Sequence, residues 1–304
     1  MATNDFQVFA GGAGANVLSQ SDWLALAALG AGFSSGMAQS AACNKAWRQS
    51  SIMAAVLAQL IVDNTGQNAT DDGTMATLLA NLKKAVGGRL LGPPRIFTSS
   101  TTYTPTPGTN SIIVEVQGGG GGGGGAPATS SSQYVASGGG ASGCYAKSLL
   151  TSGFSGVTIT VGSAGSGGVA GANNGSQGGT SSFGALISCP GGFGGVGQIA
   201  VTNGTPSFGQ VTGTQNNASG GNIINGSSNT ASLGFGAATN AMVSGSGCAS
   251  QFGGGGKGIV GSSAAGNAAV SYGAGGGGAA NNSSGSALAG GSGGPGVVII
   301  WEYA

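Results

Sequence analysis

Side chains that could do acid–base chemistry are few in the glycine-rich second half of this chain. Residues 96–304 hold two carboxylates, Glu115 and Glu302, each in a strand-like stretch. If those stretches pair, the two carboxylates could approach each other as the acid and base of a glycosidase do. Outward glutamates on strands are more often solvated or paired with a lysine, which here would be Lys147 or Lys257. We therefore expect no catalytic residues and no enzyme.

Sulfur and imidazole chemistry is equally sparse. The chain has no histidine, the commonest general base and metal ligand near neutral pH. Its cysteines form no CxxC pair and no zinc pattern, so we expect buried, reduced thiols, with a Cys144–Cys189 disulfide as the alternative. The glycine runs match G-x-G-x-x-G by repetition alone, and no acidic residue follows at the required distance. We expect neither a cofactor nor a metal. The four cysteines are Cys43, Cys144, Cys189 and Cys248.

Composition narrows the function classes further. Of 304 residues, 68 are glycine, and the net charge is only +1. A nucleic-acid partner would need a clustered basic face, so none is expected. No secretory signal and no long apolar span is visible, so no membrane insertion is expected either. Composition points to an architectural or binding protein.

The chain changes character near Pro93-Pro94, which predicts two domains, 1–92 and 93–304. Residues 1–95 hold 11 of the 15 charges and 11 of the 68 glycines, whereas residues 96–304 hold the remaining 4 charges and 57 glycines. The first part has apolar residues at helical spacing in two stretches, one from near Met37 to Asn64 and one around 75–86. A shorter helix is expected over 22–29.

One helical face is predicted to mediate self-association. An apolar stripe runs along the first long stretch, and helices of this size share little mutual core. We expect this stripe to pack against copies of the chain, and a monomeric helical hairpin is the alternative. The residues expected in the oligomeric contact are Ile52, Val56, Leu57, Leu60 and Ile61.

The second domain is predicted to be a bundle of glycine helices framed by β-strands. Strands are expected at 96–103, 111–117, 144–150, 157–162, 181–189 and 296–303. Glycine runs lie between them, the longest over 118–125. Extended helices with three residues per turn have no internal hydrogen bonds, and where they are surrounded by neighbours only glycine fits. We therefore predict a polyglycine-II bundle; flexible linkers or disordered low-complexity sequence are the alternatives.

Both parts of the sequence resemble tailed-bacteriophage proteins. The second part is similar to the distal domain of tail fibres and tip adhesins, through SIIVEVQGGGGGGGG, GCYAKSLL with VTITVG, GGTSSFGALISCPGG and GGSGGPGVVIIWEYA. The first part is similar to the helical base of prophage tail fibres, through GMAQSAACNKAWRQSSIMAAVLAQLIVDN and DDGTMATLLANLKKAV. The resemblance implies a virion protein that forms homotrimers, attaches to a baseplate or tail-tip protein, and binds a bacterial surface receptor through loops.

Receptor contacts are expected in the polar stretches that separate the glycine runs and contain scattered aromatic residues. Amides and hydroxyls supply adaptable hydrogen bonds, and aromatic rings supply rigid contact area. The candidate stretches are 126–137, 196–235, 238–252 and 280–289. Within the longest, 196–235, we single out 210–219. A second class of function stays open, a free-standing glycine-rich structural or ice-binding protein, although such a protein needs no helical docking module. The residues expected at the receptor are Asn203, Phe208, Gln215, Asn216, Asn217 and Asn229, with Tyr134 as the next candidate.

Overall fold

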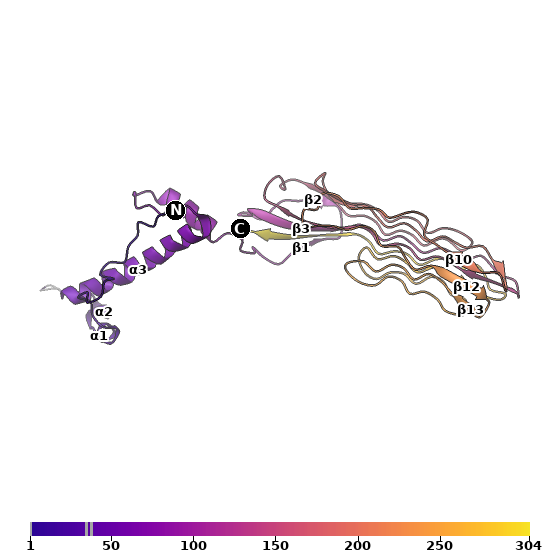
Figure 1. The fold of residues 1–304 in the computed structure, drawn as a ribbon, viewed down its shortest axis with the longest axis horizontal. Coiled ribbons are helices and arrows are strands. Elements are labelled where there is room, and N and C mark those ends of the chain that lie inside the picture. Colours follow the sequence, from indigo (N-terminus) through magenta and orange to yellow (C-terminus); the bar gives the residue numbers. More distant parts are fainter. Residues whose placement is uncertain (1, 34–35, 37–38) are drawn as a thin grey trace. The chain divides into compact units, whose positions relative to one another are not determined.

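The chain consists of two compact units, Met1–Arg89 and Leu90–Ala304, in a computed structural model that describes residues 2–33, 36 and 39–304 (Figure 1). The division falls three residues before the expected boundary. Leu90 forms a β-bridge with Tyr303, and the N–H of Leu91 donates to the carbonyl of Glu302. These backbone contacts tie the residues before Pro93-Pro94 to the last strand, so they belong to the second unit.

The first unit is helical, as predicted. It contains α1 (Gln20–Leu24), α2 (Ala28–Ala31), α3 (Ser40–Thr65) and α4 (Met75–Ala85). Helix α3 ends at Gly66, whose φ of 65° is left-handed and suits glycine. The expected start of this helix at Met37 lies outside the described residues. The expected helix over 22–29 is instead the two short helices α1 and α2.

Two antiparallel sheets form the base of the glycine-rich unit. One has the order β1 (Arg95–Phe97), β15 (Val297–Tyr303), β3 (Ser111–Gln117), β5 (Tyr145–Leu150) and β11 (Ile224–Asn225). The other has the order β2 (Thr101–Thr102), β6 (Thr158–Thr160), β7 (Ser181–Phe183) and β8 (Ile187–Cys189). Alternate residues of β3 and β15 point between the sheets and form the main core, which includes Ile112, Val114, Val116, Val298 and Ile300.

Two smaller sheets lie at the opposite end of this unit, and Figure 1 labels β10, β12 and β13 of one of them. One sheet contains β10 (Ser207–Gly209), β12 (Gly234–Ala238) and β13 (Ala241–Val243). The other has β4 (Gln133–Ala136) between β14 (Ala280–Asn281) and β9 (Val201–Thr202). None of these strands is predicted by the sequence pattern, because they are short and glycine, serine and alanine make up much of them.

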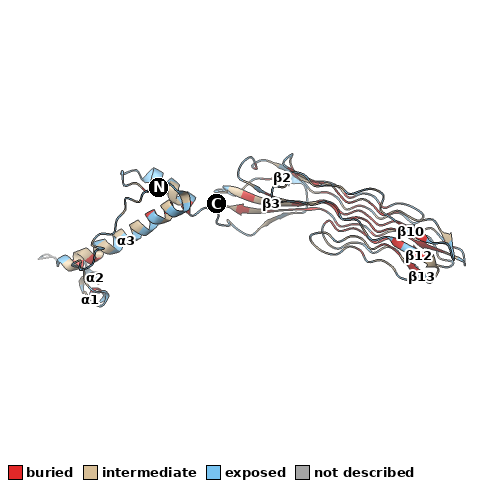
Figure 2. Cartoon of the chain, viewed as in Figure 1, coloured by how far each residue is buried: buried red, intermediate tan, exposed pale blue. Residues whose placement is uncertain are grey.

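Extended glycine segments run between the two ends and bond to one another with a period of three residues. Successive N–H groups of the buried run 118–125 donate in rotation to three neighbouring segments, at 2.8–3.0 Å. The carbonyls of 119–124 accept, again in rotation, from three other segments. Six segments thus surround this run, and buried residues continue through the interior of the bundle (Figure 2). The donors' partners lie in 138–144, 173–179 and 291–294, and the acceptors' partners in 165–168, 192–195 and 276–279.

Exposure along the outer segments repeats with the same period. In 162–169, Gly162, Gly165 and Gly168 are buried, whereas Ser163, Ser166 and Val169 are exposed. The buried positions face neighbouring backbone, where a Cβ atom would overlap a carbonyl oxygen. Glycine is therefore required at these inward positions of 162–169 and at every position of the surrounded run 118–125.

Candidate binding surface of the glycine-rich unit

The two carboxylates of the glycine-rich unit lie on opposite faces of the base sheet. In the β3–β15 ladder Glu115 lies opposite Ile299, and Glu302 lies opposite Ile112, a core residue. Glu115 forms an ion pair with Lys147 at 2.9 Å, which is one of the pairings that the sequence suggested. Because side chains alternate between faces along a strand, the two carboxylates do not form a glycosidase pair.

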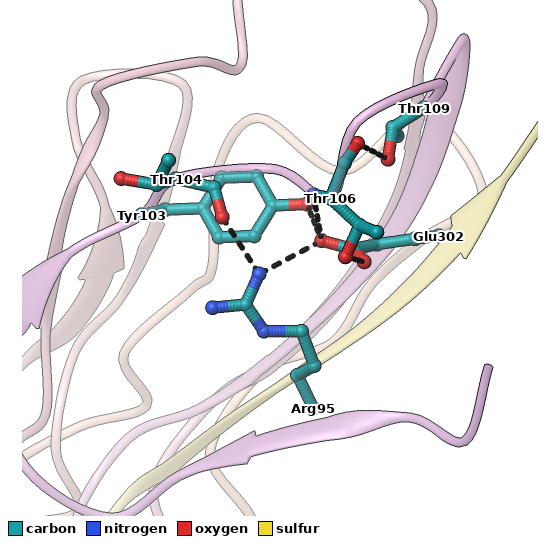
Figure 3. A network of polar contacts seen from close by, with 6 residues as sticks. All are labelled: Arg95, Tyr103, Thr104, Thr106, Thr109 and Glu302. Atoms are coloured by element: carbon teal, nitrogen blue, oxygen red, sulfur yellow. Dashed lines mark hydrogen bonds and ion pairs between the residues drawn. The ribbon is translucent and has the colours of Figure 1, made fainter. Parts of the chain in front are cut away.

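Glu302 is the centre of a hydrogen-bond network that joins the first and last segments of the unit (Figure 3). Its Oε1 accepts from the Tyr103 hydroxyl at 2.6 Å and from Arg95 Nη1 at 2.9 Å, and Thr106 bonds to both carboxylate oxygens. Burial by itself would raise the pKa of Glu302, but the bonds from Thr106, Tyr103 and Arg95 outweigh it and lower the pKa. Both carboxylate oxygens of Glu302 accept hydrogen bonds, so neither is free to act as an acid or base. The role of this network is to hold the first and last segments of the unit together.

All four cysteines are free thiols. Cys144 and Cys189 are buried in the base core, and burial raises the pKa of Cys144 to about 11. The alternative Cys144–Cys189 disulfide is therefore absent. Such buried thiols are unreactive at neutral pH, because the thiolate is the nucleophile.

Six loops gather at the end of the unit that carries β10, β12 and β13, and we call this end the tip. Hydrogen bonds connect the loops: the N–H of Asn203 donates to Ser132 at 2.9 Å, and the N–H of Thr239 donates to Asn203 Oδ1 at 2.9 Å. The N–H of Ser284 donates to Ser130 at 3.0 Å. No loop of the tip has a charged residue. The loops are 127–133, 170–174, 198–206, 238–241, 261–264 and 282–287.

The expected receptor residues divide between the tip and other places. Asn203 lies in a tip loop, and Phe208 is on β10 beside it, with its side chain 52% exposed. Tyr134 is on β4 near the tip but is fully buried, with its hydroxyl donating to the carbonyl of Thr205. Tyr134 therefore cannot contact a receptor, because the sheet of β10, β12 and β13 covers its ring.

The stretch 196–235, in which receptor contacts were expected, lies only partly at the tip. After the tip loop 198–206 the chain returns through the bundle, and Thr212 donates to Gly194 at 2.8 Å. Asn216 donates to Gly191, and Asn217 forms a bridge with Ser227. The carbonyl of Asn229 accepts from the N–H of Ser142, and the N–H of Asn229 donates to the Ser142 hydroxyl. Residues 210–219, including the exposed Gln215, thus belong to the packed body, and their replacement would remove bonds that hold the bundle.

The short tip loops 170–174 and 261–264 were missed by sequence analysis. A signal exists for 170–174 only: the glycines at 162, 165, 168 and 171 recur every three residues, and the next position in this series is Asn174. These loops are so short that their amino-acid composition does not differ visibly from the glycine-rich sequence around them.

The expected oligomeric face of α3 is only partly available. Ile52, Val56 and Leu57 are exposed. Ile61 is buried in the unit's own core with Ala58, Ala69 and Ala85, and Leu60 packs partly against this cluster. The prediction for Ile61 is corrected on this ground, because its turn of α3 faces α4. A groove of 430 Å³ runs along the exposed side, lined by Phe6, Val8, Ile52 and Val56 among others.

Comparison with known proteins places the second unit in a family. A family model described as a glycine-rich domain matches residues 97–303. No curated protein matches the chain. Among the described residues, no helix is both long and apolar enough to cross a membrane.

Proposed function

Because the chain belongs to the glycine-rich domain family through residues 97–303, we propose that its second unit is a polyglycine-II bundle that presents binding loops at its tip. The period of three in the hydrogen bonds of 118–125 supports this proposal, since that helix has three residues per turn and no internal hydrogen bonds. Packing six segments around the run 118–125 also accounts for its lack of side chains.

The function we propose is that of a tail-fibre or tip adhesin of a tailed bacteriophage, which binds a receptor on the bacterial surface. The observation that carries this proposal is the tip itself: six loops, held by hydrogen bonds on a rigid bundle. Binding residues are often found on loops that a rigid scaffold positions. The loops are rich in Asn, Ser and Thr and carry no charge, which suits recognition through hydrogen bonds and shape.

The helical unit is proposed to attach the chain to a baseplate or tail-tip protein and to form a homotrimer through α3. Ile52, Val56 and Leu57 support this role, because contiguous exposed apolar side chains mark interaction surfaces. Three copies per particle would turn a modest affinity at each tip into avid attachment to a cell.

A trimer predicts that light scattering of the full chain gives a mass near three times 28.3 kDa at micromolar concentration. Val56→Glu should give a monomer, because a charge in an apolar contact is desolvated without a partner. Met75→Glu, at a more exposed position of α4, is the control and should leave the trimer intact. A native chain that scatters as a monomer would contradict the trimer.

Immunogold electron microscopy tests the virion assignment. Antibodies raised against the purified chain should label the tail end of the phage particles that carry it. If particles are unlabelled and the chain stays in the soluble fraction of the lysate, the assignment is wrong. A free-standing structural or ice-binding protein would then be the better account, and slowed ice growth in the presence of the chain would identify the latter.

A further inference from the structure

The outer face of the sheet near the tip carries a row of exposed apolar side chains. Phe208 of β10 lies directly opposite Phe235 of β12, which lies opposite Val243 of β13. Val243 in turn forms a bridge with Val260, so the row crosses four adjacent segments. Phe208, Phe235 and Val260 are 52%, 44% and 74% exposed. We call Phe208, Phe235, Val243 and Val260 the apolar row.

Packing of the sheet does not explain this row. The inner face of the same strands carries Ser207, Gly209, Gly234, Gly236 and Met242, all buried. Gly236 lies directly on the ring of Tyr134, where a Cβ atom would overlap the ring. The sheet therefore packs against the body through Met242 and its small inner residues, whereas Phe208, Phe235 and Val260 of the outer row remain exposed and Val243 is half-buried. Exposed apolar groups of this kind are characteristic of interaction sites.

The charge near the apolar row is positive and comes from Lys257. Lys257 is exposed three residues before Val260, about 9 Å along an extended segment at the rise of such a helix. Within the described part of the glycine-rich unit, the two ion pairs join Arg95 to Glu302 and Lys147 to Glu115. Lys257 belongs to neither pair, and these pairs already engage both glutamates of the unit. One ammonium group thus lies beside the apolar row with no carboxylate to neutralise it.

We propose that the apolar row and Lys257 bind an acidic polysaccharide of the bacterial surface, an inference that rests on the adhesin function proposed above. The ring of a uronic acid has a flat face of C–H groups and a carboxylate on the same residue. The Phe208 and Phe235 rings, with centroids 5.5 Å apart and planes inclined at 50°, offer two adjacent apolar surfaces on which that face can pack. Lys257 lies on the segment two places from Phe235 and supplies the charge for a carboxylate on a neighbouring sugar of the polymer. A neutral glycan would leave this charge unused.

Binding of the labelled full chain to host cells, and to polysaccharide extracted from those cells with hot phenol, tests the proposal. Phe208→Ser with Phe235→Ser should weaken both interactions about tenfold or more, as loss of aromatic anchors does at other interfaces. Val260→Ser should weaken them about threefold, whereas Val169→Ser, at a similarly exposed valine outside the row, should have no effect. Lys257→Gln should weaken binding and reduce its dependence on salt. Thermal unfolding of each variant controls for folding, and the two valine variants decide the outcome if the double variant does not fold.

Each failure has a distinct meaning. If the native chain binds cells and the row variants bind equally well, the row is not the site, although the adhesin function stands. If the native chain binds neither cells nor polysaccharide, the adhesin function itself is wrong. Periodate treatment of the cells, which cleaves sugar diols, should abolish binding. Binding that survives periodate but is lost after protease treatment would show a protein receptor and overturn the proposal.

Discussion

Gly122→Val is expected to prevent folding of the glycine-rich unit or to destabilise it severely. A Cβ atom at this position would overlap the carbonyl oxygen of Ser166, which belongs to a neighbouring segment. Over-packing of an ordinary core costs about 1–3 kcal/mol, because side chains can move aside. Here the obstructing atom is backbone and is held by its own hydrogen bonds, so we expect a larger cost. That cost is a sizeable part of a typical total stability of about 5–15 kcal/mol.

Gly254→Val is the matched control for this substitution. Gly254 also lies in a glycine run, but a Cβ there meets nothing within 4 Å. The free energy of unfolding of the Gly254→Val variant should lie within about 0.5 kcal/mol of the native value, as is usual for surface substitutions. Urea unfolding followed by circular dichroism compares the three proteins. Equal midpoints for Gly122→Val and the native chain would refute close packing around the run 118–125.

The second large effect is expected at Glu302. Glu302→Ala removes the acceptor of the Tyr103 hydroxyl, of Arg95 and of Thr106, and leaves the buried hydroxyl of Tyr103 without this partner. Hydrogen bonds to a charged group contribute about 1.5–3 kcal/mol. We expect a loss of about 3 kcal/mol in the free energy of unfolding, at the upper end of that range, because several donors lose their partner together.

Glu115→Ala is the control, since its pair with Lys147 is partly exposed and such pairs contribute about 0–1 kcal/mol. Chemical denaturation measures the free energy of unfolding of both variants. Losses of equal size for Glu302→Ala and Glu115→Ala would show that the buried network is no stronger than a surface ion pair.

The same network predicts how stability depends on pH. The folded pKa of Glu302 is lower than its unfolded value, about 4.3 for a glutamate, so the ionised carboxylate stabilises the folded state. This contribution is complete above the unfolded pKa and is lost as the pH falls through the folded pKa. The free energy of unfolding of the native protein should therefore decrease below about pH 4. In Glu302→Gln this decrease should be smaller, because residue 302 no longer titrates. Identical pH profiles would contradict the role of Glu302.

The sequence predicted those elements that have their own local pattern. The strands β3 and β15 alternate between core and surface, and the helices of the first unit have apolar residues at helical spacing, so both were found. At this level the prediction of a helical first part and a strand-framed glycine-rich part is confirmed. That the strands pair antiparallel is a finding of the structure. The strands β10 and β12 were not found, because their buried positions are glycine or serine.

The candidate site was predicted less well for a related reason. Hydrogen bonds between distant segments decide which residues reach the tip, and glycine carries no side-chain signal for such pairing. Asn216 and Asn217 therefore looked like loop residues, although they lie in a packed segment. Tyr134 looked exposed because its neighbours are polar, although glycines of β12 leave room for the sheet to close over its ring.

Competition for adsorption tests the central claim most directly. Phage particles that carry this protein are mixed with host cells in the presence of increasing amounts of the purified full chain, and free particles are counted over time. If the tip binds the host receptor, excess chain should occupy the receptors and slow adsorption in proportion to its concentration, and Gly122→Val chain should not. Adsorption that stays unchanged at saturating native chain would contradict the claim that this protein binds the host surface.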